Sequence, residues 1–269
     1  MQRWVEVREE SWPLRAPFQI TGKTWLELSA VVVELGEGEF VGRGEAAGVY
    51  YLDESADSMI AQIRSVNAEL TAGMTRVELL DALPPGGARN AIDCALWDLE
   101  AKIRGSSVWD IAGIRYAPVQ TVMTIPIRES AEEMGQEAQR LGAYPLLKVK
   151  LDSRQPVERL TAIRKARPDA TIVVDANQGF TFELLKDVLP AMARLNIAMI
   201  EQPLPRGEDD CLEGFASPVP LCADESCLHA GELADVAARY RMINIKLDKC
   251  GGLTAALCLA NQGRRWICH

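Results

Sequence analysis

The fold of this chain is decided by TIVVD at residues 171–175, IAMIE at 197–201 and PLCAD at 220–224. Each segment is a short apolar run that ends on an acid, and the three acids Asp175, Glu201 and Asp224 are 26 and 23 residues apart. That spacing leaves room for one helix between consecutive runs. The pattern therefore predicts parallel strands joined by helices, with the three acids at the carboxyl ends of the strands.

The same alternation extends along the chain from about residue 118. Amphipathic stretches such as 157–166 predict helices, and the predicted strands are 119–124, 146–151, 171–175, 197–201, 219–224 and 242–247. Because no GxGxxG or Walker-type glycine loop occurs, a (β/α) barrel is favoured over a nucleotide-binding doubly wound sheet. A closed barrel of this class needs eight strands, and only about six are present here.

The first part of the chain has a different pattern of apolar and polar residues. A strand pair is predicted at 25–37 and 40–45, and helical stretches follow, of which 89–104 has the clearest helical spacing. We therefore divide the chain into an α+β domain at 1–115 and a partial (β/α) barrel domain at 116–269.

The composition excludes several classes of function. A net charge of −9 over 269 residues argues against nucleic acid and against an anionic membrane as partners. No signal peptide or membrane-spanning run is recognised, and the seven cysteines form no CxxC pair, so a cytoplasmic location is expected. Since the only histidines are His229 and His269, a metal would be held by carboxylates, which favours Mg²⁺ or Mn²⁺ over zinc.

The acids Asp175, Glu201 and Asp224 are candidate metal ligands. Neighbouring parallel strands end side by side at one mouth of a barrel, so the three carboxylates should converge there. Converging carboxylates raise one another's pKa unless a cation lies among them. Any one of them alone would more often cap the next helix, but three in register behind apolar runs favour a metal site.

Lysines are predicted on both sides of this site. In LKVKL at 147–151, Lys148 and Lys150 share one face of a strand, and their repulsion should let at least one lose its proton readily, as a general base must. Lys246, near the end of the last predicted strand, lies across the mouth. Lys249 is a competing candidate that ranks lower because it is predicted in the following turn. The alternative for each lysine is an exposed residue at a strand edge or strand end.

Two lysines on opposite sides of a metal suit a 1,1-proton transfer. One lysine would remove the α-proton of a carboxylate substrate from one face. The metal would stabilise the enediolate, and the other lysine would return a proton to the opposite face.

At this point the chain resembles a known family, the L-Ala-D/L-Glu dipeptide epimerases in the muconate-lactonising group of the enolase superfamily. The strings that carry the resemblance are RNAIDCALWDLEAK, LLKVKLD, VDANQGF, EQPLP, CADES and NIKLDKCGGLT. The resemblance implies an α+β capping domain followed by a modified TIM-type barrel. It implies Lys150 and Lys246 as the acid/base pair, a supporting Lys148, and Mg²⁺ or Mn²⁺ on the three acids named above.

The resemblance further implies a small dipeptide substrate of the L-Ala-Glu type, linked in the family to recycling of cell-wall peptides. Loops at 14–23 and 44–51 would cover the mouth, with Arg15 as a candidate for the substrate's side-chain carboxylate. Members of the family continue through a seventh and an eighth strand, so a truncated chain is expected. The sequence leaves the oligomeric state open, a homo-oligomer included.

Three alternatives stay open. Muconate cycloisomerase, o-succinylbenzoate synthase and N-acylamino acid racemase share the metal-and-two-lysine site and differ in substrate. A catalytically impaired remnant could keep the metal ligands without turnover. A Schiff-base aldolase would need one lysine and no carboxylate triad, and borohydride trapping would reveal it.

Overall fold

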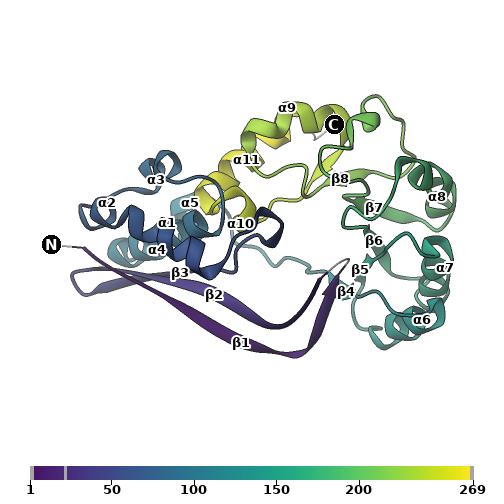
Figure 1. Ribbon diagram of the computed structural model, residues 1–269, viewed down its shortest axis with the longest axis horizontal. Coiled ribbons are helices and arrows are strands. Elements are labelled where there is room, and N and C mark those ends of the chain that lie inside the picture. Colours follow the sequence, from purple (N-terminus) through teal and green to yellow (C-terminus); the bar gives the residue numbers. More distant parts are fainter. Residues whose placement is uncertain (1–2, 21–22, 267–269) are drawn as a thin grey trace.

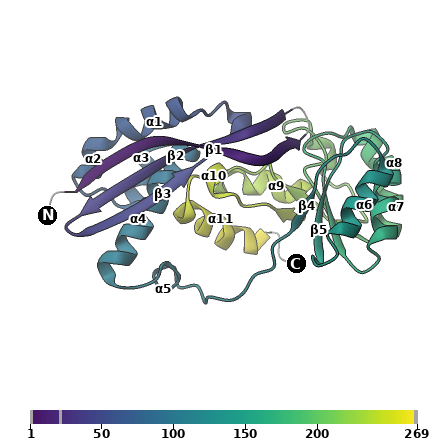
Figure 2. The ribbon, with the colours of Figure 1, turned by 90° about the horizontal axis from the view of Figure 1, so that it is seen from below.

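The computed structural model describes residues 3–20 and 23–266 of the chain. Its first part contains an antiparallel sheet in the order β1-β2-β3. The strands are β1 (Trp4–Ile20), β2 (Lys23–Glu37) and β3 (Phe40–Ala46). The long β1–β2 hairpin reaches from the helices of the first part to the parallel strands of the second (Figures 1 and 2).

Helices of the first part pack against β2 and β3. A buried cluster joins apolar residues of β2, such as Val33 and Leu35, to Ile92 and Leu99 of the longest helix. This helix lies so close to β3 that a Cβ on Gly44 would meet the Ala91 carbonyl oxygen at 2.1 Å. The helices are the 3-10 turn η1 (Tyr50–Leu52), α1 (Ala56–Ser65), α2 (Asn67–Thr71), α3 (Arg76–Ala82), α4 (Gly87–Arg104) and α5 (Val108–Ala112).

The second part is a parallel sheet with helices between its strands. Among the described residues it has six strands in the order β4-β5-β6-β7-β8-β9. They are β4 (Met123–Ile125), β5 (Leu146–Lys150), β6 (Thr171–Asp175), β7 (Ile197–Glu201), β8 (Leu221–Ala223) and β9 (Met242–Ile243). This alternation of strand and helix, with sequential strands as neighbours, confirms the predicted fold class of a partial (β/α) barrel behind an α+β part.

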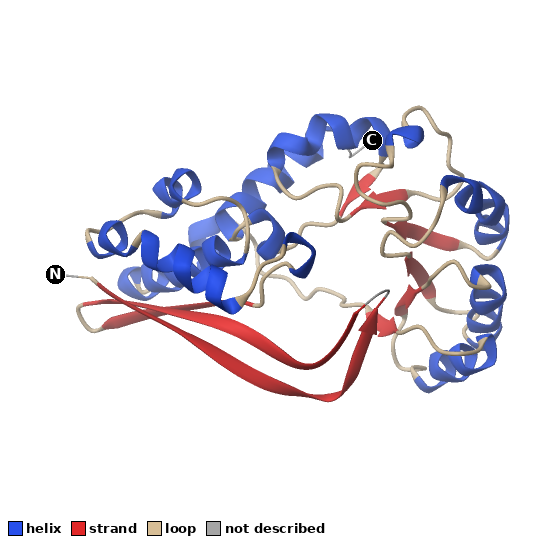
Figure 3. Ribbon diagram, in the orientation of Figure 1, coloured by secondary structure: helices blue, strands red, loops and turns tan. Residues whose placement is uncertain are grey.

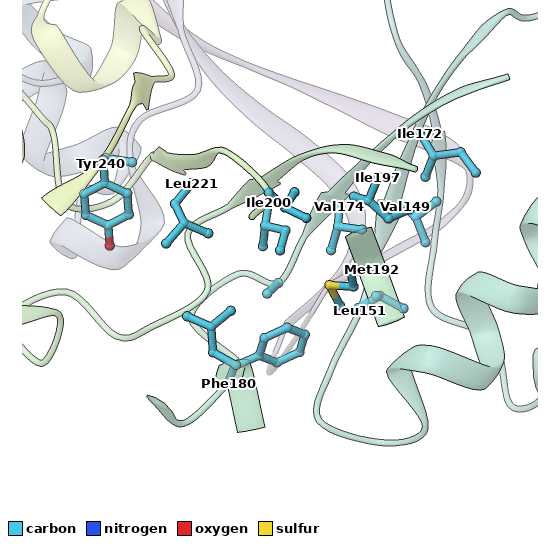
Figure 4. Close-up of a cluster of buried hydrophobic side chains, with 14 of the residues drawn as sticks. Val149, Leu151, Ile172, Val174, Phe180, Met192, Ile197, Ile200, Leu221 and Tyr240 are labelled. Carbon is cyan, nitrogen blue, oxygen red and sulfur yellow. The ribbon is translucent and has the colours of Figure 1, made fainter. Parts of the chain in front are cut away.

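The helices of this part are α6 (Ala131–Arg140), α7 (Pro156–Ala166), α8 (Phe182–Arg194), η2 (Asp210–Leu212), η3 (Ala230–Glu232), α9 (Leu233–Arg239), α10 (Leu247–Cys250) and α11 (Leu253–Trp266). Of these, α6, α7 and α8 lie on the outer side of the strands (Figures 1 and 3). Their apolar faces and the strands form a second buried cluster, which includes Val149, Val174, Ile200 and Met192 (Figure 4). Burial of these side chains fixes which strand residues point outward to the helices and which point to the barrel interior.

Structural predictions for the cap and the barrel were wrong in three places, and one of them is the first barrel strand, which was predicted at 119–124 and begins only at Met123. Residues 14–20 were predicted as part of a loop, yet they belong to β1 and pair with β2 up to Ile20 and Lys23, while residues 21–22 of that loop lie outside the described residues. Consecutive side chains of this arm, such as Leu14 and Arg15 or residues 26–28, are exposed, so they lack the alternation that marks a half-buried strand. The last predicted strand also ends early, because β9 stops at Ile243.

Within residues 3–20 and 23–266, no helix combines the length and apolar character needed to cross a membrane.

Candidate functional site

The three predicted acids lie in a row at the carboxyl ends of β6, β7 and β8. Asp175 is the last residue of β6 and Glu201 the last of β7, and the two are register partners. Asp224 follows β8 directly. All three are buried, with 0%, 2% and 1% of their surface exposed. The structure therefore brings together the three acids that the sequence placed at one mouth.

Lysines from β5 bind one end of this row. The Lys148 Nζ lies 2.9 Å from Asp175 Oδ2 and donates to Glu201 Oε2 at 2.6 Å. The Lys150 Nζ donates to Asp175 Oδ2 and to Asn177 Oδ1, both at 2.7 Å. Both lysines thus point to the barrel interior, as the alternation of LKVKL predicts.

Lysines from the last βα unit bind the other end. The Lys246 Nζ donates to Asp224 Oδ2 at 2.5 Å, and the Lys249 Nζ donates to Asp224 Oδ1 at 2.6 Å. Because the sheet order runs from β5 to β9, Lys150 and Lys246 stand at opposite ends of the row of carboxylates. Lys246 itself lies in an extended segment that precedes α10 rather than on a strand.

The pKa values of two of the carboxylates are shifted in opposite directions. Burial raises the pKa of Glu201, and the nearby Asp175 raises it further. Burial also acts to raise the pKa of Asp224, but the ammonium groups of Lys249 and Lys246 outweigh it and lower the value to about 2. Asp224 therefore stays ionised over the whole range in which the protein would work.

The sequence predicted that at least one of Lys148 and Lys150 loses its proton readily, and in this arrangement Lys148 is not that residue. Burial lowers the pKa of Lys148, but the carboxylates of Asp175 and Glu201 more than compensate, and the pKa lies above its ordinary value. The pKa of Lys246 is likewise raised, since Asp224 outweighs the effect of burial. Attraction to the acids that face these lysines therefore outweighs the repulsion between the lysines on which the prediction was based.

The donor set fits a hard divalent cation by its chemistry, because three buried carboxylates supply the oxygen ligands that Mg²⁺ prefers. Within the described part of the chain, however, no three acidic, histidine or cysteine side chains are placed so that they enclose a metal ion. Their oxygens are bound instead by the ammonium groups of four lysines, namely Lys148, Lys150, Lys246 and Lys249. A cation would have to displace those contacts, so the metal site stays a prediction.

Lys249 does not lie where it was predicted, in the turn after the last strand. It lies in α10, only 2% exposed, and not in a turn. Its Nζ also donates to the carbonyl oxygens of Asp224, Cys227 and Asn244, at 2.6, 3.2 and 2.8 Å. With every one of these bonds pointing into the protein, Lys249 is held as a structural ammonium group.

Sequence reasoning also missed several polar residues of the site. Asn177 binds Lys150, and the Asn244 Nδ2 donates to Glu201 Oε1 at 2.9 Å. Glu225 is 2% exposed, and burial together with Asp224 raises its pKa to about 7. Their position in the sequence could have identified them, since each of these residues lies within three residues of a predicted ligand or lysine.

The cap contributes a loop and a hollow beside the site. Tyr50 and Tyr51 of η1 share a hollow of about 350 Å³ with Lys246. Arg15, the predicted substrate-binding residue, is exposed and lines a separate hollow of about 850 Å³, which Tyr50 also lines. Tyr50 therefore lines both hollows, and among the described residues no hydrogen bond or ion pair joins Arg15 to the row of carboxylates.

Two known families match the two parts of the chain. Residues 2–113 match the mandelate racemase/muconate lactonizing enzyme N-terminal domain, and residues 127–266 match the enolase C-terminal domain-like family.

Two relatives are similar over most of the chain. The L-Ala-D/L-Glu epimerase of Escherichia coli is 47% identical over 97% of this chain and 82% of its own length. An N-acetyl-D-glutamate racemase of Pseudoalteromonas is 40% identical over 87% of this chain and 75% of its own length.

Solved structures agree with this similarity. An enolase family member from Agrobacterium tumefaciens with bound L-Ala-L-Glu superposes with a TM-score of 0.95 at 37% identity, over 98% of this chain and 81% of its own. A dipeptide epimerase from Methylococcus capsulatus, in complex with Mg and L-Arg-D-Lys, gives a TM-score of 0.86 at 30% identity, over 98% and 80%.

Proposed function

The chain belongs to the mandelate racemase/muconate lactonizing enzyme group of the enolase superfamily, and from that membership and the site geometry we propose that it epimerises a dipeptide of the L-Ala-D/L-Glu type. The observation that carries the proposal is the placement of Lys150 and Lys246 at opposite ends of a buried row of three carboxylates. Inversion at one carbon needs a proton acceptor and a proton donor on opposite faces, and this arrangement provides both.

In this proposal each lysine serves one face of the substrate's α-carbon. Lys150 takes or gives the proton on one side, and Lys246 does so on the other. Asn177 orients the Lys150 amine through its 2.7 Å hydrogen bond. Lys148 is supporting, because its ammonium group balances the charge of Asp175 and Glu201.

Asp175, Glu201 and Asp224 are the residues that would hold Mg²⁺ or Mn²⁺. A bound divalent cation would stabilise the negative charge that develops on the substrate carboxylate when the α-proton leaves. Binding would also draw the acids away from Lys148 and Lys246, which removes the main cause that raises the pKa of these two lysines. Magnesium in the related Methylococcus enzyme supports this assignment.

The capping part is proposed to select the substrate. Tyr50 and Tyr51 flank the hollow above Lys246, and Arg15 supplies a cation for the substrate's side-chain carboxylate. A small-molecule substrate and a cytoplasmic location stay predictions of the sequence, which leaves the oligomeric state open.

The proposal is tested by proton exchange. The protein is incubated with Mg²⁺ and L-Ala-L-Glu, or with L-Ala-D-Glu, in deuterated water, and the Glu α-proton is followed by NMR. The wild type should exchange both epimers and interconvert them. Lys150→Ala and Lys246→Ala should each abolish inversion, and each should block exchange from one epimer only.

Two results would overturn the proposal. The first is a wild type that exchanges neither epimer with Mg²⁺ or Mn²⁺ present. The second is a Lys246→Ala variant that still inverts the substrate while Lys249→Ala does not, because the second base would then be Lys249.

Racemisation of an N-acylated glutamate is a second candidate function. It is favoured by the similarity to the Pseudoalteromonas racemase, whose named substrate shares a glutamate with that of the Escherichia coli relative. The same exchange measurement with N-acetyl-D-glutamate decides between them, because the better substrate is the one with the larger kcat/KM.

A further inference from the structure

The motif RNAID at residues 89–93 faces the chain that follows Lys246, although these segments are about 160 residues apart in sequence. The buried Arg89 donates from its guanidinium to the carbonyl oxygens of Cys250 at 2.6 Å and Gly251 at 3.1 Å. Asp93 accepts the Thr254 amide at 2.9 Å and the Thr254 hydroxyl at 2.6 Å. One face of α4 thus binds both α10 and the start of α11.

The two segments approach each other closely at Gly251 and Gly252. A Cβ on Gly251 would meet Arg89 Nε at 2.4 Å, and a Cβ on Gly252 would meet the Asp93 side chain at 2.5 Å. Both glycines have positive φ, of 74° and 110°, which side-chain-bearing residues rarely adopt. The backbone after α10 is therefore fixed against α4.

Asp248 is the contact of this interface that lies nearest to the site, two residues after Lys246. Asn90 Nδ2 of α4 donates to Asp248 Oδ1 at 2.5 Å. Burial raises the pKa of Asp248, and hydrogen bonds from Asn90 and from the backbone of Ala47 and Gly48 lower it. The one carboxylate therefore joins α4, the cap loop that leads to Tyr50, and the segment that carries Lys246.

Lys246 needs such support more than Lys150 does. The Lys150 side chain is 11% exposed and is held by two partners, Asp175 and Asn177. The Lys246 side chain is 45% exposed, and among the described residues its hydrogen-bond partner is Asp224. Because Asp224 is also a proposed metal ligand, that ion pair cannot fix the amine during the reaction, and the backbone of residues 246–248 has to do so.

We propose that Asp248, held by Asn90, is a positioning residue that fixes Lys246 and the cap loop at 47–51 relative to each other. The effect of this positioning on the rate of proton transfer rests on the proposed function, whereas its effect on the position of Lys246 and the cap loop does not. A displacement of the amine by about 1 Å would slow the proton transfers that use Lys246 by about ten- to a hundredfold and leave those that use Lys150 nearly unchanged.

The kinetic test uses the single variants Asn90→Ala and Asp248→Ala and a double variant that combines Asn90→Asp with Asp248→Asn. Lys246→Ala first identifies the epimer whose α-proton Lys246 removes. For that epimer, exchange at saturating substrate should fall in both single variants, while exchange of the other epimer should change less than about twofold. The double variant keeps one donor and one acceptor at the contact, so it should restore the rate of proton exchange that the single variants lose.

Asp98→Ala is the matched control. Asp98 is also a carboxylate on α4, but it accepts from the Arg43 amide and from Lys102, inside the cap. Its loss should leave the ratio of the two exchange rates unchanged. A fall of equal size for both epimers in the Asp248 variant would show a merely structural role and would overturn the proposal.

A second readout is independent of turnover. Acetic anhydride labels accessible amines, and mass spectrometry gives the labelling rate of each lysine. Lys246 should be labelled several times faster in the two single variants than in the wild type, whereas the labelling rate of Lys150 should not change. The double variant should label Lys246 at the wild-type rate. Equal Lys246 rates in all variants would refute the positioning role even for a protein without epimerase activity.

Discussion

At the scale of single residues, three lysines of the site carry the same charge but have different surroundings and therefore different roles. Lys249 is enclosed and donates to four oxygens, so its position is fixed by the protein. Lys148 bridges two carboxylates, whereas Lys246 is half-exposed and lines the hollow that it shares with Tyr50 and Tyr51. Burial and partner count, rather than residue type, separate a structural lysine from a candidate base.

This difference predicts unequal effects on stability. Lys249→Met leaves Asp224 and three carbonyl oxygens without their buried donor, and removal of one partner of such a pair costs about 3–5 kcal/mol. Lys246→Met removes a half-exposed partner and should cost less than about 1 kcal/mol. Urea denaturation of the metal-free protein measures both changes. Equal midpoints for the two variants would contradict the assignment of Lys249 as structural.

Glu225 predicts how stability depends on pH in the metal-free protein. Burial and Asp224 raise its pKa from 4.5 to about 7, so the folded state keeps a proton that the unfolded state has already lost. The associated stability is fully present below pH 4.5 and is lost as the pH rises through about 7. Glu225→Gln cannot titrate and should flatten that decline. Chemical denaturation between pH 5 and 8 compares them, and parallel curves would contradict the prediction.

At the scale of elements, α4 and the α10–α11 junction form one interlocking unit. The sequence of each looks ordinary by itself, since a helix with a buried stripe and a Gly-Gly turn are common. Their match becomes visible only when Arg89 and Asp93 are seen against Gly251 and Gly252. The interlock predicts that a single methyl group at the junction has a large effect.

Gly251→Ala should be strongly destabilising. It adds a Cβ 2.4 Å from Arg89 Nε at a φ of 74°, so steric overlap adds to a backbone cost of about 1–3 kcal/mol. Gly105→Ala is the control, because Gly105 at the end of α4 has φ of 58° and open space around its Cβ. Thermal melts should show a clearly larger loss for Gly251→Ala. A similar loss in both would mean that the overlap with Arg89 contributes nothing.

At the scale of the whole molecule, the two parts have separate buried clusters that are joined through α4. We expect them to unfold together as long as that junction holds. Five of the six tryptophans lie within residues 1–115, so fluorescence reports mainly on the cap, whereas far-UV circular dichroism reports on helices of both parts.

The two signals should therefore give the same melting temperature in the wild type. In Arg89→Met, which loses the bonds to Cys250 and Gly251, the two transitions should separate. Coincident transitions in the variant would show that the cap and the barrel are coupled through other contacts.

The sequence by itself determined the barrel, the three acids and the lysines of LKVKL. Each of these follows from a local pattern, because an apolar run fixes a strand, alternation fixes the direction of a side chain, and strand ends in a parallel sheet share one edge. The strand conformation of the hairpin arm was not predicted, because an exposed strand shows no alternation of apolar and polar residues.

Only the tertiary structure decided what each charge does. Residues such as Asn177, Asn244, Lys249 and Asp248 act through partners that are distant in sequence or on another element, and pKa values depend on all charges nearby. The raised pKa of Lys148 and the enclosure of Lys249 were unpredictable for this reason. Local sequence sets where a side chain points, whereas the folded chain sets what it meets there.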